Sequence, residues 1–185
     1  MNQWHYSQAA RALHAGGVIA YPTEAVWGLG CDPYNETAVR RLLALKRRPV
    51  HKGVILVAAS MTQIEPLLRG LAPEHLERLQ ASWPGPNTWL LPDPDNIIPS
   101  WIKGKHSSVA VRVSAHPGVI SLCKAFGRPI VSTSANPSSA EPARTLLRVS
   151  TYFGKKLDYY LPGKLGDLAQ PTTIQDLRDS RVVRS

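Results

Sequence analysis

Short apolar segments that are typical of buried strands alternate along this chain with stretches of helical periodicity. Strands separated by helical patterns of about 10–15 residues indicate an α/β domain with a mixed sheet. We therefore expect one domain over residues 1–185, built from a mixed sheet with flanking helices. The expected strands are residues 18–21, 54–57, 88–91, 109–113, 130–131, 159–161, 173–177 and 182–184. The expected helices are residues 5–15, 36–48, 61–69, 73–81, 117–126 and 143–153, the second of them opened by Asn35 as its N-cap and closed by Pro49.

Two connections are predicted to be irregular. Residues 23–33 contain Gly28, Gly30 and Pro33 and are expected to form a loop, and a proline-rich connection separates the strands at 88–91 and 109–113. Proline and glycine favour turns because proline fixes φ and glycine tolerates positive φ.

The charge balance predicts an anionic partner. Lys and Arg number 22 against 13 Asp and Glu, so the formal net charge is +9. An excess of this kind favours binding to nucleic acid or to phosphate-bearing ligands, and by itself it does not distinguish them. Because 43% of the residues are hydrophobic and 19% charged, an ordinary globular protein is indicated rather than a disordered chain.

The sequence gives no indication of a membrane segment or an exported protein. No apolar run approaches the ~18 residues needed to span a bilayer, and the first residues lack the features of a secretory signal. We therefore expect a cytoplasmic location with Cys31 and Cys123 reduced. No CxxC pair occurs, so no zinc or other protein metal site is predicted.

Several common catalytic and phosphate-binding motifs are absent from the sequence. There is no GxxxxGK[ST], HExxH or GxSxG, and Pro33 stands where a dinucleotide-binding fingerprint begun at Gly28 would need its third glycine. The six histidines are scattered, so no histidine-based triad can be assembled from their spacing. The chemistry must therefore depend on other groups.

The first candidate cluster is Lys46-Arg47-Arg48, at the end of a predicted helix before Pro49. Lys46 and Arg48 cannot share one face of a regular helix, but they can converge on one anion if the helix frays there. The alternative is that these cations only stabilise the negative end of the helix dipole.

The second cluster is Ser132-Thr133-Ser134-Ala135-Asn136, directly after a predicted buried strand. Small hydroxyl residues at the carboxyl edge of a sheet can surround a phosphate or a carboxylate. The alternative is a turn that merely ends the strand.

The third candidate is Arg112, which alternates with apolar residues and must face solvent or lie half-buried against a negative group. A guanidinium suits a carboxylate because it can bind both oxygens.

These clusters follow one another as the motifs of the YrdC family do, and the chain resembles its short, single-domain bacterial branch. The resemblance is strong over residues 16–150 and weaker beyond, through the segment 171–174. It rests on residues 21–32 (YPTEAVWGLGCD), Lys46-x-Arg48-Pro49, residues 83–88 (WPGPNT), residues 109–112 (VAVR) and residues 132–136 (STSAN).

The resemblance implies a fold and a reaction. The fold is a twisted α/β sheet around a basic concave cleft, and the reaction makes threonylcarbamoyl-adenylate and pyrophosphate from L-threonine, bicarbonate and ATP, with Mg²⁺ bridging the phosphates. A partner complex would then transfer the threonylcarbamoyl group to N6 of adenosine 37 in tRNA. An enzyme of this kind is a nucleotidyltransferase.

The resemblance also implies roles for individual residues. Lys46, Arg48, Ser132 and Asn136 would be catalytic and would bind ATP, together with Ser108, Thr145 and Arg184. Arg112 would hold the threonine carboxylate, with Thr23, Ser134 and Thr172 as further threonine contacts. Glu24 and Asp32 are left as either acid–base groups or structural residues.

A second function class is an RNA-binding or ribosome-maturation module of the same fold without this chemistry, and a third is a family member of different activity. The Ser and Asn residues beside Lys46 and Arg48 favour the enzyme, since a purely electrostatic binder needs only basic residues. Basic residues outside the cleft are expected to form a solvated surface that could steer tRNA: Arg40, Arg41, Lys103, Lys105, Lys155 and Lys156.

Overall fold

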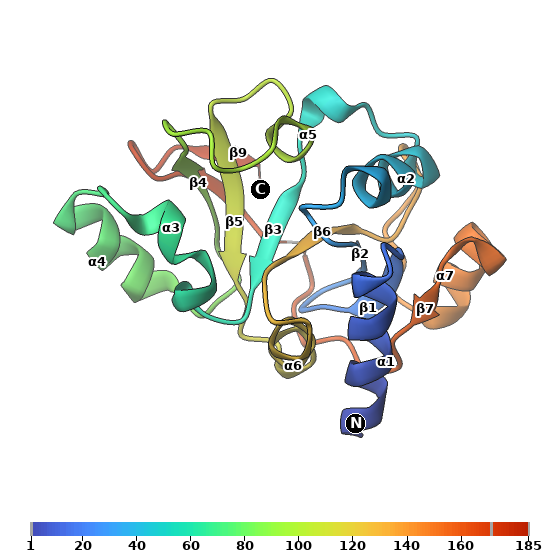
Figure 1. Ribbon diagram of the computed structural model, residues 1–185. Helices are drawn as coiled ribbons and strands as arrows, with labels where there is room; N and C mark the ends of the chain where they lie inside the picture. The colour runs from blue at the N-terminus through green and yellow to red at the C-terminus, as the bar shows by residue number, and fades with distance from the viewer. Residues whose placement is uncertain (1, 171, 185) are drawn as a thin grey trace.

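The strands form a single mixed sheet with helices on both of its faces (Figure 1). The computed structural model describes residues 2–170 and 172–184, apart from the side chain of Arg184. The strands are β1 (Ile19–Pro22), β2 (Trp27–Gly30), β3 (Ile55–Ala58), β4 (Thr88–Pro92), β5 (Ser108–Val113), β6 (Ile130–Ser134), β7 (Tyr159–Tyr160), β8 (Ile174–Asp176) and β9 (Val182–Arg184). The helices are α1 (Gln3–His14), α2 (Glu36–Lys46), α3 (Glu65–Leu68), α4 (Pro73–Ser82), α5 (Ser100–Lys103), α6 (Pro117–Phe126) and α7 (Leu146–Phe153), with 3₁₀ turns η1 (Val50–Lys52), η2 (Met61–Ile64) and η3 (Gly154–Lys156).

The strand order differs strongly from the chain order. Across the sheet the nine strands run β7-β1-β2-β6-β3-β5-β4-β8-β9. The pairs β1–β7, β3–β5 and β4–β8 are parallel, and the other pairs are antiparallel. The predicted α/β class, with a mixed sheet and flanking helices, is confirmed.

The two faces of the sheet are covered differently. Side chains alternate along a strand, so Val109, Val111 and Val113 of β5 share one face while Ala110 and Arg112 share the other. The three valines are buried in a large core together with side chains from α2, α3, α4, α5 and α7.

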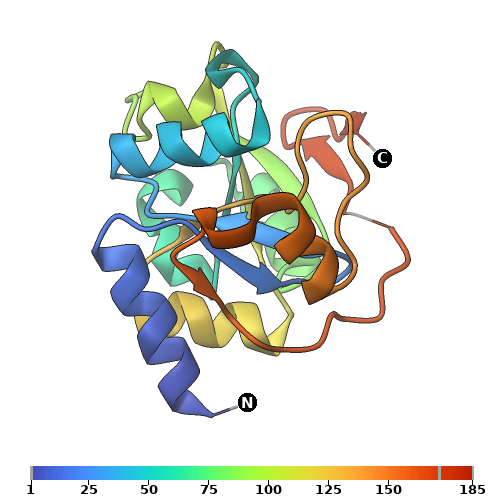
Figure 2. The same cartoon turned by 90° about the vertical axis from the view of Figure 1, so that its right-hand side faces the viewer.

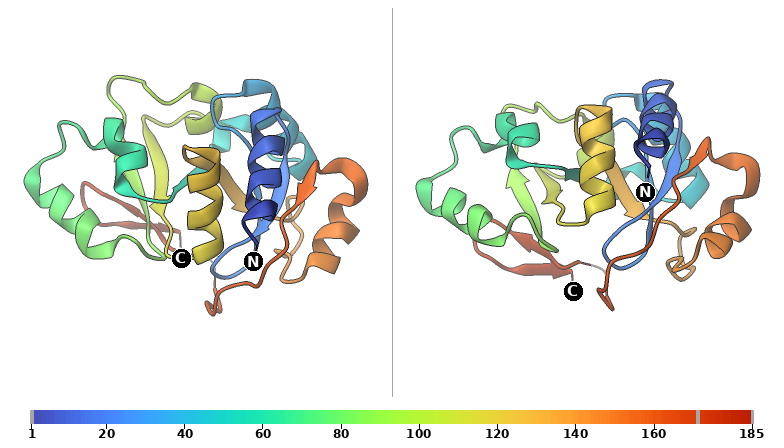
Figure 3. Two further views of the ribbon diagram at one scale, coloured as in Figure 1. Left: turned by 60° about the horizontal axis from the view of Figure 1, so that its bottom comes forward. Right: turned by 90° about the horizontal axis from the view of Figure 1, so that it is seen from below.

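The opposite face is covered only in part, by α1 and α6. These two helices lie side by side against β1 and β3 (Figure 3) and bury a second core that includes Val57 and Ile130. Two residues away along the same strands, Ile55 and Ser132 lie beyond the helices and line a cavity. The cavity therefore exists because the two helices stop short of the full length of the face.

A long connection, whose described residues are in neither helix nor strand, leads from β7 to β8 around one side of the molecule (Figure 2). Its backbone is hydrogen-bonded to the segment after β1: Gly166 N donates to Thr23 O at 3.0 Å and Leu168 N to Glu24 O at 3.1 Å. Gln170 in this connection and Thr172 just before β8 line the same cavity. The connection thus forms part of the cavity wall.

The prediction that residues 23–33 form a loop is wrong, because they contain β2. Gly28 pairs with Tyr21 of β1 and with Ser134 of β6, so β2 is an interior strand. Its glycines are needed for space: a Cβ on Gly30 would lie 2.8 Å from Tyr21 Cε1 and 2.8 Å from Val131 O. The glycines that indicated a loop therefore serve close packing.

Other predicted boundaries also shift. The helix at 117–126 is confirmed residue for residue. The short helix α5 lies in the connection predicted to be irregular, and β6 continues to Ser134, so the hydroxyl residues expected after this strand are part of it. In the described residues, 2–170 and 172–184, no helix has both the length and the apolar character to cross a bilayer.

Replacing Gly30 with alanine should lower the free energy of unfolding by about 1–3 kcal/mol, because the new methyl group overpacks the space beside Tyr21 and Val131 O. Urea denaturation measures the effect. Gly118→Ala is the comparison, because there the added Cβ meets side chains rather than backbone, His116 at 3.0 Å and the Tyr6 hydroxyl at 3.7 Å. A loss in Gly30→Ala no larger than in this control would contradict the packing argument.

Candidate functional site

A basic cavity of about 1050 Å³ opens on the part of the sheet that α1 and α6 leave uncovered. Strands β3, β4, β5, β6 and β8 contribute to its lining, and among the described residues its two lining carboxylates belong to Glu24 and Asp176. Because positive groups outnumber carboxylates, the cavity favours anionic ligands. The basic residues of the lining are Lys46, Arg48, Lys52, Lys103, Lys105, Arg112, Arg178 and Arg181.

Most of the predicted site residues are brought together in this cavity. Thr145 is absent from the lining; it caps α7, where its hydroxyl accepts a hydrogen bond of 3.1 Å from Arg148 N. The side chain of Arg184 lies outside the described residues. The nucleotide contacts of these two residues stay predictions. The predicted residues that line the cavity are Thr23, Lys46, Arg48, Ser108, Arg112, Ser132, Ser134, Asn136 and Thr172.

Lys46 is a buried lysine that joins two of the predicted clusters. It is the last residue of α2, only 4% exposed, and its Nζ donates to the backbone oxygen of Ser134 and, at 2.7 Å, to that of Asn136. In the other direction, Ser138 N donates to Lys46 O at 2.7 Å. These bonds hold the end of α2 against the segment that follows β6.

Burial, together with the nearby positive charge of Arg48, lowers the pKa of Lys46 from 10.5 to about 7. The neutral amine is therefore well populated near neutral pH. An anion entering the cavity would favour the ammonium form and raise the pKa again. Lys46 is thus set to gain a proton when an anionic ligand binds.

The low pKa of Lys46 makes stability depend on pH. Between about pH 7 and pH 10 the unfolded chain keeps the lysine proton while folded Lys46 has lost it, so the free energy of unfolding should rise with pH. Lys46→Met should remove this rise. Urea denaturation of both proteins at pH 7 and pH 9.5 tests it, and an unchanged difference between the two proteins at the two pH values would contradict the shifted pKa.

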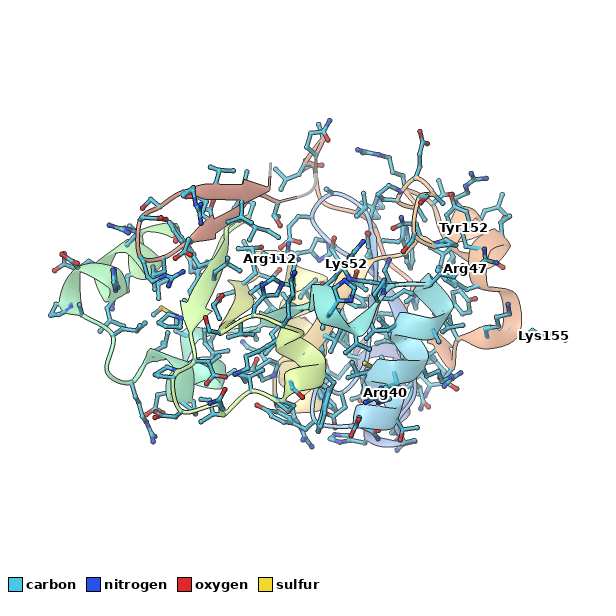
Figure 4. The ribbon with its side chains drawn as sticks, turned by 90° about the horizontal axis from the view of Figure 1, so that it is seen from above. Arg40, Arg47, Lys52, Arg112, Tyr152 and Lys155 are labelled. Carbon is cyan, nitrogen blue, oxygen red and sulfur yellow. The ribbon has the colours of Figure 1, made fainter. Side chains whose placement is uncertain are left out.

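Arg48 reaches the cavity from just beyond the helix. The helix ends at Lys46 rather than fraying, because Arg47 takes a left-handed conformation with φ of 53°. The guanidinium of Arg48 donates from Nε and Nη2 to Gly53 O at 3.1 and 2.9 Å, which fixes its place. In Figure 4, Lys52 and Arg112 lie toward the middle of the molecule, whereas Arg47 lies at the α7 end with Tyr152 and Lys155.

Arg112 lies against a negative group of the chain itself. It is 6% exposed, its Nη2 lies 3.2 Å from Glu24 Oε2, and its Nη1 donates to Thr172 Oγ1 at 2.8 Å. The other oxygen of Glu24 accepts from Ser114 Oγ at 2.6 Å. Of the two environments that the sequence left open for Arg112, the one beside a negative group is confirmed. Glu24 is its counter-ion.

Three buried polar atoms in this region have no hydrogen-bond partner among the described residues. They are Arg112 Nε, a donor, and the acceptors Asn136 Oδ1 and Glu24 Oε2, of which the last is in an ion pair with Arg112. The amide nitrogen of Asn136 donates to Pro137 O at 3.0 Å and to Ala140 O at 2.6 Å, which sets the orientation of the amide. Since buried polar groups are normally paired, these atoms indicate where a bound ligand would make contacts.

Hydroxyl groups complete the lining. Ser132 Oγ accepts from Tyr21 at 2.8 Å, and Thr23 Oγ1 donates to Val26 O at 2.7 Å. Thr172 Oγ1 lies 3.2 Å from Thr88 Oγ1 in addition to its bond with Arg112. The small polar side chains of Thr23, Ser132 and Thr172 thus line the cavity together with the basic residues.

The expectation of a solvated surface is wrong for Lys103, which is buried, with Nζ 2.7 Å from Asp93 Oδ2 and 2.8 Å from Asn96 Oδ1. Lys105 is exposed, as expected, but both lysines line the cavity rather than lying outside it. Arg41 forms an ion pair, because its guanidinium lies 2.6 Å from the carboxylate of Asp158. A lysine beside apolar residues carries no local signal of such burial, because the pairing depends on tertiary structure.

Further lining residues were not found from the sequence. Lys52 lies in η1, and Asp176, Arg178 and Arg181 come from β8 and the turn that follows it.

Asp32, which the sequence left as acid–base or structural, accepts from Tyr34 N at 3.0 Å and lies 3.7 Å from Arg128. Within the described part of the chain, no group of three or more His, Cys, Asp or Glu residues could hold a metal ion.

Comparison with known proteins gives strong matches over the whole chain. The family model Sua5_yciO_yrdC, described as "Telomere recombination", matches residues 11–185. The chain is 52% identical over 189 residues to the threonylcarbamoyl-AMP synthase of Saccharophagus degradans, covering 100% of this chain and 98% of that protein. It is 57% identical over 176 residues to the threonylcarbamoyl-AMP synthase of Pseudomonas paraeruginosa, covering 95% and 94%.

A solved structure shows the same fold. P. abyssi Sua5, in a crystal structure complexed with L-threonine, superposes with a TM-score of 0.90 at 31% identity over 98% of this chain. This chain spans 53% of the length of that protein. A family match over residues 11–185, relatives above half identity and a shared fold agree with the order of motifs, and the chain belongs to the Sua5/YciO/YrdC family.

Proposed function

We infer that this protein is a threonylcarbamoyl-AMP synthase, a nucleotidyltransferase that makes an adenylate from ATP and L-threonine. The observation that carries this inference is the placement, in one cavity, of Lys46 and Arg48 with Arg112. The triphosphate of ATP needs cations such as Lys46 and Arg48. The carboxylate of an amino acid needs a cation such as the guanidinium of Arg112. The curated relatives bear the same activity in their names.

Lys46 and Arg48 would bind the phosphates of ATP. The carbamate oxygen of carboxylated threonine attacks the α-phosphorus, and the bond from this phosphorus to the bridging oxygen of pyrophosphate breaks. Negative charge is gathered in one place throughout this step. Fixed cations and hydrogen-bond donors lower the barrier because they need no reorganisation as the reaction proceeds.

Arg112 would bind the threonine carboxylate. Its Nη1 is occupied by Thr172 and its Nη2 by Glu24, while the buried Nε is the donor without a partner. A carboxylate arriving at the edge of Nε and Nη2 would satisfy Nε and share Nη2 with Glu24. Thr23 and Ser134 line the cavity and would be further threonine contacts, and Ser108 lines it and would contact the nucleotide. P. abyssi Sua5, whose structure holds L-threonine, supports this choice of ligand.

Magnesium would enter as the ATP complex. Mg²⁺ prefers oxygen ligands and usually keeps several waters, so a dedicated protein cage is not required. The buried, unpaired Oδ1 of Asn136 fits such an ion or its water shell. Bound there with the phosphates, the ion would neutralise charge on the leaving pyrophosphate.

The remaining elements of the activity follow from the resemblance. Bicarbonate would supply the carbamate carbon, and a transferase complex would pass the threonylcarbamoyl group to N6 of adenosine 37 in tRNA. Since its product serves tRNA modification, the protein is expected to work in the cytoplasm.

The test is pyrophosphate release from purified protein given ATP, L-threonine and bicarbonate, with each omitted in turn. We expect release only when all three are present. Threonine-independent release, or none, would contradict the proposal. If the protein releases none and instead binds RNA with an affinity that falls steeply with salt, the RNA-binding function would be favoured.

A further inference from the structure

Tyr21 contacts the cavity only through another side chain. It lies in β1, is fully buried, and its hydroxyl donates to Ser132 Oγ at 2.8 Å. Burial raises the pKa of Tyr21 above its usual value, so the hydroxyl keeps its proton. Tyr21 therefore stays a hydrogen-bond donor at every pH at which the protein works.

The tyrosine ring is held in one position by the glycines of β2. A Cβ on Gly28 would lie 3.2 Å from Tyr21 Cζ, and one on Gly30 would lie 2.8 Å from Tyr21 Cε1. The ring thus occupies the space that side chains at these two positions would take. On its other side it packs in the core formed with α1 and α6.

The contact fixes the role of the serine. A hydroxyl has one hydrogen and can accept at its oxygen, and Ser132 Oγ already accepts from Tyr21. No acceptor for the serine hydrogen is found among the described residues, and Ser132 lines the cavity. The serine hydrogen is therefore available for a ligand in the cavity.

We propose that Tyr21 is a positioning residue, which makes Ser132 a donor to an anionic oxygen of the bound nucleotide or carbamate. This rests on the proposed function for the identity of the ligand. Without the tyrosine hydroxyl, the Ser132 side chain could rotate and donate its hydrogen to another acceptor. Its oxygen would no longer accept a hydrogen bond from a fixed donor. The donor would then be less well preorganised for the phosphate.

A double-mutant cycle of Tyr21→Phe and Ser132→Ala tests this coupling. We expect Tyr21→Phe to lower kcat/KM for ATP about three- to tenfold, the usual worth of one hydrogen bond. In the Ser132→Ala background the same change should have less than about a twofold effect, because its target is gone. Tyr159→Phe is the matched control, since Tyr159 contacts His5 Nδ1 at 3.0 Å, away from the cavity. It should leave kcat/KM unchanged.

The affinity for ATP, measured by calorimetry on the same four proteins, separates this proposal from the proposed function. If the unmodified protein releases no pyrophosphate, the proposed function fails, and the cycle is then decided by ATP affinity alone. Equal effects of Tyr21→Phe with and without the Ser132 hydroxyl, or no effect in either, would overturn the positioning role. Thermal unfolding of each variant shows whether a loss is due to instability, because a purely structural effect would persist in the Ser132→Ala background.

Discussion

Lys46→Met should lower pyrophosphate release by about 100-fold or more, the magnitude typical of losing one preorganised charged donor. The amine is buried and lies beside Arg48, so no solvent-exposed lysine can replace it. Methionine keeps an unbranched apolar stem of similar length, which limits the structural damage. Steady-state kinetics with ATP as the varied substrate measures the effect.

The result has a second readout in proton uptake. At pH 8, ATP binding to the unmodified protein should take up a proton, because Lys46 is largely neutral before binding and charged afterwards. Calorimetry in buffers of different ionisation enthalpy measures this uptake, and Lys46→Met should abolish it. Lys155→Ala, a substitution of an exposed lysine near α7, is the control for both readouts. If the activity of Lys46→Met is within threefold of that of the unmodified protein, Lys46 does not bind the phosphates of ATP.

Arg112→Met should destabilise the fold and abolish threonine binding together. Removing the guanidinium leaves the buried Glu24 carboxylate without its counter-ion, which costs about 3–5 kcal/mol for a buried pair broken from one side. The threonine carboxylate would lose its partner as well. Urea denaturation and threonine-dependent pyrophosphate release measure the two effects.

The double variant Arg112→Met with Glu24→Gln separates the two consequences. Stability should recover in large part, because no unpaired charge stays buried. Threonine-dependent activity should not recover, since the guanidinium is still absent. If activity returns with stability, Arg112 holds Glu24 in place and does not bind substrate.

Elements with local signals were predictable from the sequence. The helix after Asn35 begins where expected because the Asn35 side chain accepts from Ala38 N at 3.0 Å, a bond that sequence reasoning can anticipate. The helix at 117–126 likewise combines apolar periodicity with a closing glycine, Gly127, in a left-handed conformation. In both cases a few neighbouring residues decide the structure.

Elements that depend on distant partners were not predictable in this way. Strand β2 has few apolar side chains to reveal it, and it is a strand because β1 and β6 lie on either side. Lys103 is buried because Asp93 and Asn96 meet it in three dimensions. Nor does any spacing place Glu24 beside Arg112; the pairing follows from the strand order.

The strand order also determines when the cavity can come into existence. Its floor needs β6 beside β3 and β8 beside β4, pairings between residues 55 and 132 and between residues 88 and 174. Such long-range contacts close slowly, and chains dominated by them fold in milliseconds to seconds. A nascent chain that has been synthesised only as far as β5 contains Lys46, Arg48 and Arg112. It still lacks the Ser132–Asn136 segment and Thr172. Competence to bind nucleotide should therefore arise in the last stage of folding, after synthesis of nearly the entire polypeptide.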